Sequence, residues 1–301
     1  YSRDEMKQWT MAQKFEGDTR VRFIIGDVRD KDSLSRALDG IDYVVHAAAT
    51  KIVPTAETNP FECIKTNING SMNVINASIN NKVKKVVALS SDKASSPLNL
   101  YGATKLCADK LFIAANNYIG KKKLSFSVVR YGNVMGSRGS VIPLFIKQKE
   151  KGILSITDKE MTRFNITMTE SINLVIWTIQ NSYGADIIVP KIPSYRIIDV
   201  VKSICENCKI QIIGKRPGEK LHEEMITETD ALNTIDLGNY YAILPSVSYT
   251  CSEEDYLLHH KSKKVPFGFK YNSATNTEWE SVDSLRKLIR EHLDNNFSIE
   301  N

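Results

Sequence analysis

The residues of this chain that can do chemistry are concentrated in two short motifs, Ser90-Ser91-Asp92-Lys93 and Tyr101-Gly102-Ala103-Thr104-Lys105. Together they supply hydroxyls, a carboxyl group, amines and a phenol, a set suited to moving protons beside a hydride transfer. A phenol titrates near pH ~10 in water, so it acts as a base at neutral pH only where a cation stabilises its anion. We expect Lys105 to be that cation for Tyr101, although an exposed tyrosine and a solvated lysine on an ordinary helix give the same short pattern.

The first motif is expected at the end of a strand and the second on the helix that follows. The apolar run Lys85–Leu89 predicts a buried parallel strand, so residues 90–93 lie at its carboxyl end, where open α/β sheets place their ligands. Residues 101 and 105 are one helical turn apart, which predicts that their side chains share one face of the following helix.

Strand-like and helix-like segments alternate through the first half of the chain. This alternation predicts an α/β fold with a doubly wound parallel sheet. The expected strands are short apolar segments, at residues 21–25, 43–46, 85–89 and 125–130. The expected helices are longer periodic segments, near residues 33–38, 60–79 and 100–118.

The positions after the first two strands are those where a nucleotide lies in such a fold. Asp27 follows the first strand and Ala47-Ala48-Ala49 follows the second, where small side chains let a nucleotide approach the backbone; simple packing of helix on sheet explains the alanines equally well. No G-x-G-x-x-G turn follows a strand near the start, so we expect the first βα unit to be missing from this chain or lost from the protein. Arg3, at the apparent end of a second strand, either contacts the 2′-phosphate of NADP or is an ordinary surface arginine.

The second half of the chain is less regular and predicts a smaller α/β lobe that closes over a substrate. Phe164 is a candidate neighbour of a base or sugar, and three arginines are candidate clamps for a diphosphate, although each alone is more often a surface residue: Arg138, Arg163 and Arg216. Further strands are expected at residues 186–189, 210–213 and 241–244, and a helix at residues 197–205.

Composition and charge agree with an enzyme that acts on a small molecule. Of the 301 residues 42% are hydrophobic, and no apolar run approaches the length that spans a membrane. The net charge of +5 is mild, and the basic clusters at residues 121–123 and 261–264 are not interleaved with aromatic residues. An anionic small substrate fits this charge, and we expect no nucleic-acid partner and no membrane partner.

The cysteines argue for a reducing compartment, so we expect a cytoplasmic protein without a disulfide scaffold or a metal site. They are odd in number and scattered along the chain: Cys63, Cys107, Cys205, Cys208 and Cys251. Cys205 and Cys208 have the spacing of half a zinc site or of a redox pair. No second such pair supports zinc, so the favoured interpretation is two incidental thiols at the end of a helix.

Six motifs together resemble the extended short-chain dehydrogenase/reductase family: Ser91–Ala94, Asn99–Lys105, Arg130–Asn133, Gly136–Ser140, Met161–Phe164 and Arg216–His222. More narrowly, they resemble the inverting UDP-N-acetylglucosamine 4,6-dehydratases of bacterial pseudaminic acid synthesis, and the resemblance runs through nearly the whole chain. Two features depart from the pattern. The glycine-rich unit is absent, which bears on cofactor binding, and Thr50-Lys51-Ile52 replaces an expected Leu-Lys-His, which bears on affinity.

The resemblance implies a mechanism in which carbon 4 of UDP-N-acetylglucosamine is oxidised by NADP, water is lost, and hydride returns to carbon 6 with inversion at carbon 5. Tyr101, with Lys105 beside it, takes the proton of the 4-hydroxyl, and Ser91 binds the 4-oxygen. Lys93 removes the proton on carbon 5, and Asp92 protonates the departing 6-hydroxyl.

The resemblance also implies two binding sites. The implied cofactor-binding residues are Arg3, Asp27, Val28, Ala47, Ala48, Ala49, Lys51, Asn67, Tyr101 and Lys105. The implied substrate-binding residues are Lys51, Asn133, Arg138, Val141, Arg163, Arg216 and Glu219. We expect an N-terminally truncated NADP-binding Rossmann domain of residues 1–140 and 165–190, a nucleotide-sugar lobe of residues 141–164 and 191–301, and a homo-oligomer.

Two other functions stay open from the sequence. A UDP-hexose 4-epimerase of the same fold uses the serine, tyrosine and lysine but needs no acid and amine after the strand, so Asp92 and Lys93 favour the dehydratase. A catalytically inactive nucleotide-binding protein would suit the absent glycine-rich turn, but not the retention of every reactive side chain.

Overall fold

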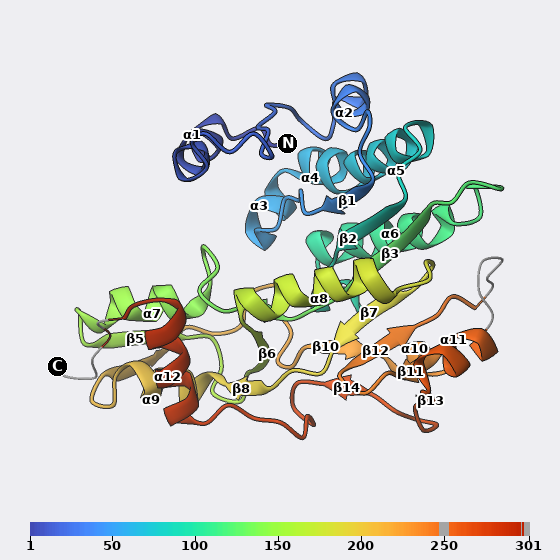
Figure 1. Ribbon diagram of the computed structural model, residues 1–301. Coiled ribbons are helices and arrows are strands. Elements are labelled where there is room, and N and C mark those ends of the chain that lie inside the picture. Colours follow the sequence, from blue (N-terminus) through green and yellow to red (C-terminus); the bar gives the residue numbers. More distant parts are fainter. Residues whose placement is uncertain (247–252, 296, 298–301) are drawn as a thin grey trace.

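A seven-stranded sheet forms the centre of the computed structural model, which describes residues 1–246, 253–295 and 297 (Figure 1). Its strands, in spatial order, are β1 (Tyr43–His46), β2 (Lys85–Leu89), β3 (Ser125–Val129), β7 (Ile187–Pro190), β12 (Tyr240–Ile243), β11 (Thr234–Asp236) and β13 (Lys263–Lys264). The first four run parallel, and β12, β11 and β13 add antiparallel to this block. The predicted strands at 43–46, 85–89 and 125–130 are confirmed.

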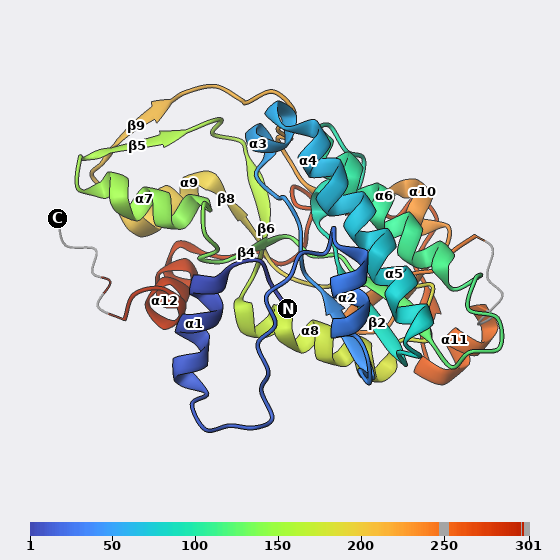
Figure 2. The ribbon, with the colours of Figure 1, turned by 90° about the horizontal axis from the view of Figure 1, so that it is seen from above.

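Helices cover both faces of this sheet, as seen from the two directions of Figures 1 and 2. One face packs on α2 (Lys31–Ala37), α5 (Gly70–Asn80) and α6 (Leu100–Ala115), and the other on α8 (Met168–Asn181) and α11 (Glu253–His260). Successive side chains of β2 point to opposite faces of the sheet, so this strand packs on both helical layers. Val86 belongs to the hydrophobic cluster that contains Phe112, and Val87 belongs to the cluster that contains Leu174. The predicted doubly wound α/β fold is confirmed.

The predicted strand at 21–25 does not join the sheet. It makes one parallel bridge, between Ile25 and Ser2, and among the described residues β1 has a partner on one edge only. Extended segments need neighbouring strands to become stable, and this one has a single short neighbour. Gln8 of α1 (Glu5–Lys14) donates to the Ile24 carbonyl at 2.8 Å, and α3 (Val53–Thr58) follows β1 along the chain.

The predicted long helix at 60–79 forms in three consecutive parts, which are α4 (Pro60–Ile64), a π-helical turn (Lys65–Asn69) and α5. π-Helical turns of this kind occur often at functional sites.

A second core lies beside the sheet, where α7 (Val141–Lys149), β5 (Ile153–Ile156), α9 (Ile197–Ile204) and α12 (Val282–His292) pack together. β5 pairs with β9 (Lys209–Ile212), and β4 (Asn133–Val134), β6 (Thr162–Ile166) and β8 (Ser194–Arg196) form a small sheet. β10 (Glu224–Ile226) pairs with β14 (Tyr271–Asn272), near α10 (Glu228–Ala231).

Three strands within the predicted substrate-lobe range of residues 191–301 belong to the main sheet. β11, β12 and β13 were expected in the substrate lobe, but they extend the main sheet through the pairing of β12 with β7. The division into two domains itself stays a prediction.

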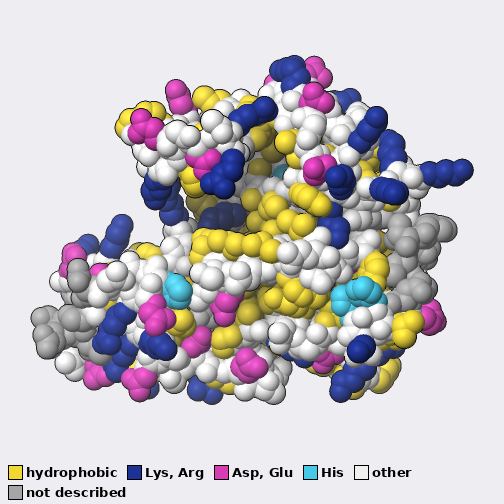
Figure 3. Space-filling model, in the orientation of Figure 1, with side chains coloured by type: hydrophobic (Ala, Val, Ile, Leu, Met, Phe, Trp, Pro, Cys, Tyr) yellow, Lys and Arg dark blue, Asp and Glu magenta, His cyan; other side chains and the backbone are white. Residues whose placement is uncertain are grey.

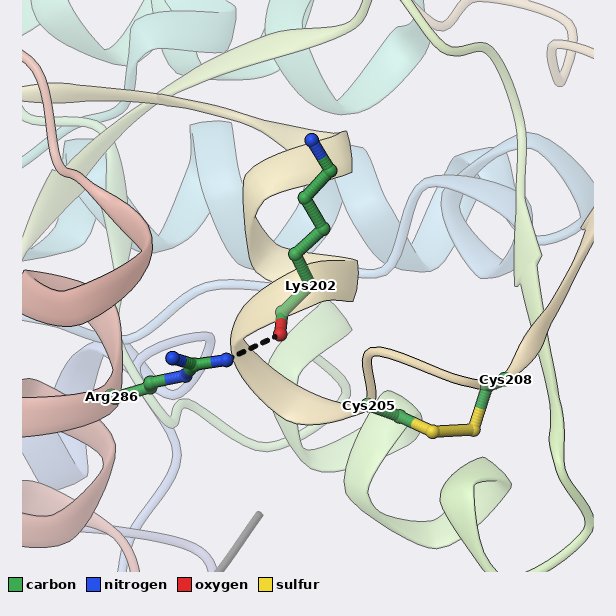
Figure 4. The surroundings of a disulfide bond; sticks show 4 residues. All are labelled: Lys202, Cys205, Cys208 and Arg286. Carbon is green, nitrogen blue, oxygen red and sulfur yellow. Dashed lines mark hydrogen bonds between the residues drawn. A yellow bond between two sulfur atoms is a disulfide. The ribbon is translucent and has the colours of Figure 1, made fainter.

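A disulfide joins Cys205 and Cys208 after the end of α9, so the expectation of two incidental thiols is wrong (Figure 4). The chain leaves the helix at Cys205 in an extended conformation and turns toward β9, which brings the two Cα atoms to 5.5 Å. Nearby, the Arg286 guanidinium of α12 donates a hydrogen bond to the Lys202 carbonyl at 3.2 Å. Cys63 and Cys107 are free thiols, and Cys251 lies outside the described residues.

Candidate active site

The first predicted motif lies where β2 ends. The backbone amide of Ser90 donates to the Val129 carbonyl at 2.7 Å, and that of Asp92 donates to the Tyr131 carbonyl at 3.1 Å. The chain then forms a short 3-10 turn, η2 (Asp92–Ala94). The expected position at the carboxyl end of a parallel strand is confirmed.

The buried Asp92 and the partly buried Lys93 form an ion pair with a third partner. The Ser91 hydroxyl donates to Asp92 Oδ1 at 2.8 Å, and Lys93 Nζ lies 3.1 Å from that same oxygen and 3.1 Å from Glu223 Oε1. Burial lowers the pKa of the Lys93 amine, but the two carboxylates outweigh burial, and the pKa lies above its ordinary value. Lys93 is therefore an ammonium in this structure.

Tyr101 lies on the first turn of α6, packed against η2. Asn99 caps the helix by accepting from the Gly102 amide at 2.8 Å. Gly102 allows close packing, since a Cβ there would lie 2.3 Å from the Lys93 carbonyl oxygen. Burial raises the pKa of the Tyr101 phenol to about 12, and the charge of Lys93 and the nearby Ser91 hydroxyl oppose this rise.

Lys105 lies one turn further along α6, as its spacing predicted, and it is buried. Its amine donates to the Leu89 carbonyl at 2.5 Å, and burial lowers its pKa. Its stabilising role toward the phenolate stays a prediction. Behind it, Asp109 Oδ2 accepts from the Ser90 hydroxyl at 2.8 Å and pairs with Arg130 at 3.3 Å. This buried network ties α6 to the ends of β2 and β3.

Arg163, predicted as a diphosphate clamp, is directed at the protein's own chain. Its guanidinium donates to the carbonyls of Leu221 and Lys220, each at 3.0 Å. It also pairs with Glu219 at 3.6 Å and with Glu223 at 3.8 Å. Arg163 therefore fixes the loop before β10 against β6, and its contact with a substrate stays a prediction.

Glu223 is a site residue that the sequence interpretation missed. It is 2% exposed and contacts Lys93 directly. Its position immediately after the Arg216–His222 motif could have indicated that Glu223 lies at the site. Its partner Lys93, however, is more than a hundred residues away in the sequence.

On the predicted cofactor side, Asp27 holds two arginines. Its carboxylate accepts from Arg29 at 2.7 Å and lies 3.6 Å from Arg3. The hydrogen bonds from Arg29 lower the pKa of Asp27 although burial opposes them. The Val28 carbonyl accepts from Asn73 at 2.9 Å, which fixes this loop to α5.

The loop after β1 is open and internally braced. Ala47–Ala49 and Lys51 are exposed, and the small side chains of the three alanines leave the backbone there accessible, which is compatible with a nucleotide. Asn67, in contrast to these exposed residues, is buried. Its amide accepts from the Thr50 amide at 2.8 Å and donates to the Thr50 carbonyl at 3.0 Å and to Thr104 Oγ1 at 2.9 Å. Asn67 thus shapes the loop.

The remaining predicted substrate residues lie on two elements and in two loops. Asn133, on β4, is partly buried and donates to the Tyr195 hydroxyl at 3.4 Å. Val141 is the first residue of α7, and the side chains of Arg138 and Arg216 are exposed.

The surface between the N-terminal elements and α8 is hollowed, with basic and hydrophobic side chains around the hollow (Figure 3). On α8 itself, three apolar side chains are exposed along one face: Met168, Ile172 and Ile176.

Residues 1–245 match the family model described as polysaccharide biosynthesis protein. The chain belongs to this family. This membership confirms the predicted relation to the extended short-chain dehydrogenase/reductases.

The matches to individual relatives cover most of this chain and most of each relative. A UDP-N-acetylglucosamine 4,6-dehydratase (inverting) from Campylobacter jejuni is 50% identical over 294 residues, which are 96% of this chain and 88% of the relative. A UDP-glucose 4-epimerase from Rickettsia akari is 41% identical, over 96% of this chain and 85% of its own. The X-ray structure of Pen from Bacillus thuringiensis matches with a TM-score of 0.87 at 40% identity, over 96% of this chain and 88% of that one.

The described residues contain neither a membrane-spanning helix nor a metal-binding cluster. None of their helices combines the length and apolar character needed to cross a membrane. No three His, Cys, Asp or Glu side chains in that part of the chain are grouped to hold a metal ion.

Proposed function

We propose that the protein is an inverting UDP-N-acetylglucosamine 4,6-dehydratase that uses NADP. The single observation that carries this proposal is the Asp92–Lys93 ion pair beside Tyr101, since an acid and an amine next to the phenol are what water elimination requires. The 50% identity to relatives of that name supports it. We further propose a cytoplasmic homo-oligomer whose product serves a bacterial surface glycan, such as pseudaminic acid on flagellin.

Oxidation at carbon 4 is the first step. The nicotinamide cofactor, when bound, supplies the oxidant for carbon 4 and the reductant for carbon 6. Tyr101 takes the proton of the 4-hydroxyl once its phenol has itself lost a proton, which burial opposes and the charge of Lys93 favours. Ser91 donates a hydrogen bond to the 4-oxygen, where negative charge collects. A donor of this kind is worth about 3 kcal/mol in a dry site.

Elimination needs a base at carbon 5 and an acid at the 6-hydroxyl. The ammonium of Lys93 lies 3.1 Å from the carboxylate of Asp92. Transfer of one proton across this contact makes Lys93 a neutral amine and Asp92 a carboxylic acid. Lys93 then removes the carbon 5 proton, which the 4-ketone has acidified, and Asp92 protonates the departing 6-oxygen so that water leaves. Hydride from the bound cofactor would then reach carbon 6, and a proton from solvent on the opposite face of carbon 5 would complete the inversion.

The 4-epimerase is the second candidate, because relatives such as that of Rickettsia akari carry this name at 41% identity. Epimerisation moves hydride at carbon 4 alone and has no use for an acid–amine pair. The pairing of Asp92 with Lys93 therefore favours the dehydratase.

Proton NMR of the full-length protein with NADP⁺ and UDP-N-acetylglucosamine in deuterium oxide tests the proposal. We expect a 6-deoxy methyl signal, a 4-keto group and deuterium at carbon 5, with coupling constants that report inversion. An intact 6-hydroxymethyl group with conversion at carbon 4 would establish the epimerase. Cofactor binding without any turnover would establish an inactive nucleotide-binding protein.

A further inference from the structure

Glu223 is a buried carboxylate between two cations. Its Oε1 lies 3.1 Å from Lys93 Nζ and 3.8 Å from the Arg163 guanidinium. Its other oxygen, Oε2, is buried with no hydrogen-bond partner among the described residues. Burial of a carboxylate oxygen without a hydrogen-bond partner costs folding free energy. The contacts of Oε1 therefore indicate why a carboxylate stands at this position.

The backbone of Glu223 is rigidly held. Its amide donates to Ser273 Oγ at 2.9 Å, and its carbonyl accepts from the Ser273 amide at 2.8 Å. The Ser273 hydroxyl also bonds to Thr162 Oγ1 at 2.7 Å. Support of this kind fixes where the carboxylate lies relative to η2.

The Lys93 amine needs such support. It ends a flexible four-carbon stem, and 27% of its side chain is exposed, so one contact with Asp92 leaves it free to move. Glu223 supplies a second contact from a different part of the chain. It also lies against Arg163, whose charge would otherwise repel the ammonium.

We propose that Glu223 is a positioning residue: its carboxylate holds the Lys93 amine beside Asp92 and keeps that amine protonated until the proton moves to Asp92. The inference rests on the proposed dehydratase function for its catalytic meaning. The effect of the Glu223 carboxylate on the Lys93 amine can be measured without substrate.

The charged and titratable groups around Lys93 come from five elements. Asp92 lies on η2 and Glu223 precedes β10, and both carboxylates stabilise the ammonium. Arg163 on β6 opposes it, and Lys220, in the loop before β10, is also a repelling cation. Two phenols, on α6 and β8, lie within reach of its charge: Tyr101 and Tyr195.

Removal of the Glu223 charge must lower the pKa of Lys93, because it removes a stabilising anion and leaves the repelling cations. The test is Glu223→Gln, which keeps the size of the side chain. Glu224→Gln is the matched control, since it makes the same change one residue later. An amine-reactive reagent labels only neutral amines, and peptide mass spectrometry follows its reaction with Lys93 across pH.

We expect labelling of Lys93 in Glu223→Gln to begin about one pH unit lower than in wild type, a difference of about tenfold in rate at a fixed pH. Glu224→Gln should label as wild type does. Equal labelling of Lys93 in wild type and Glu223→Gln, or an equal shift in Glu224→Gln, would overturn the proposal.

Carbon 5 deuterium exchange is measured on the same proteins. Glu223→Gln should move the acidic limb of its pH profile to lower pH and reduce the maximal rate about tenfold, with KM within about twofold of wild type. An unmoved limb and an unchanged rate would overturn the positioning role. If wild type shows no exchange and no product, the dehydratase proposal fails, while the labelling shift still decides the relation of Glu223 to Lys93.

Discussion

Gly102 lies so close to Lys93 that a Cβ at position 102 would be 2.3 Å from the Lys93 carbonyl oxygen. The backbone of α6 therefore rests directly on the turn that carries the acid and the amine. Because Tyr101 precedes this glycine, the contact sets the distance between the phenol and the Asp92–Lys93 pair.

The change Gly102→Ala tests this contact. In an exposed helix, alanine in place of glycine stabilises by up to ~1 kcal/mol, so any loss must come from the clash. We expect destabilisation of about 1–3 kcal/mol, because the opposing atom is backbone and cannot rotate away. Thermal unfolding measures the stability, and turnover should fall in the fraction that remains folded. A variant as stable and active as wild type would show that α6 and η2 can separate freely.

Asp92→Asn separates oxidation from elimination. The amide keeps a hydrogen bond to Ser91 but cannot receive the proton of Lys93 or give one to the departing oxygen. We expect formation of 6-deoxy product to fall by about 10²–10⁴-fold, the range typical of a lost general acid. Oxidation at carbon 4, followed as a transient reduced cofactor, should persist. Simultaneous loss of both steps would place Asp92 in the first step as well.

The buried His46 should make the free energy of unfolding depend on pH. Burial, and secondly the charge of Lys105, lower its pKa to about 3, and its ring packs 5.5 Å from that of Phe112. The unfolded chain takes up a proton near pH ~6.5 and the folded chain does not, so this contribution is present above that pH and is lost as pH falls toward 3.

Between pH 7 and pH 5 the loss from His46 should reach about 2 kcal/mol. Urea unfolding at the two pH values measures it. The His46→Asn variant should lack this part of the pH dependence, whereas His292→Asn, which changes an exposed histidine of α12, should keep it. An identical pH dependence in His46→Asn would contradict the buried neutral state.

Features of the sequence that depend on local pattern were predictable. The apolar run of β2 and the four-residue spacing of Tyr101 and Lys105 depend on neighbours along the chain, and both elements formed as expected. The segment at 21–25 has the same local pattern, but among the described residues it makes one bridge, to Ser2, and does not join the sheet. Local pattern therefore predicts the tendency to form a strand, and tertiary pairing decides the outcome.

Features that depend on distant partners were not predictable in the same way. Glu223 becomes a site residue only because the fold brings the loop before β10 onto η2. The addition of β12 to β7 likewise depends on a pairing that no local signal encodes. The Cys205–Cys208 disulfide was missed for another reason: the spacing allowed a redox pair, but the inference from cysteine number to compartment favoured two separate thiols, and the turn after α9 brings them together.

Asn67→Ala tests the loop that is predicted to meet the cofactor. The side chain satisfies both backbone groups of Thr50 and also bonds to Thr104, so its removal leaves three polar groups without this partner. We expect a stability loss of about 1–3 kcal/mol. We also expect KM for the cofactor to rise about tenfold with little change in kcat, because the loop loses its shape and not its chemistry.

Lys51→Ala is the companion variant, since it removes an exposed side chain of the same loop without disturbing the brace. Isothermal titration with the cofactor, on folded protein, separates the two effects. If Lys51→Ala weakens binding while stability is unchanged, the lysine itself contacts the cofactor. If Asn67→Ala binds the cofactor as tightly as wild type, the shape of this loop does not control binding, and the nucleotide must be held from the side of Asp27 and Arg3.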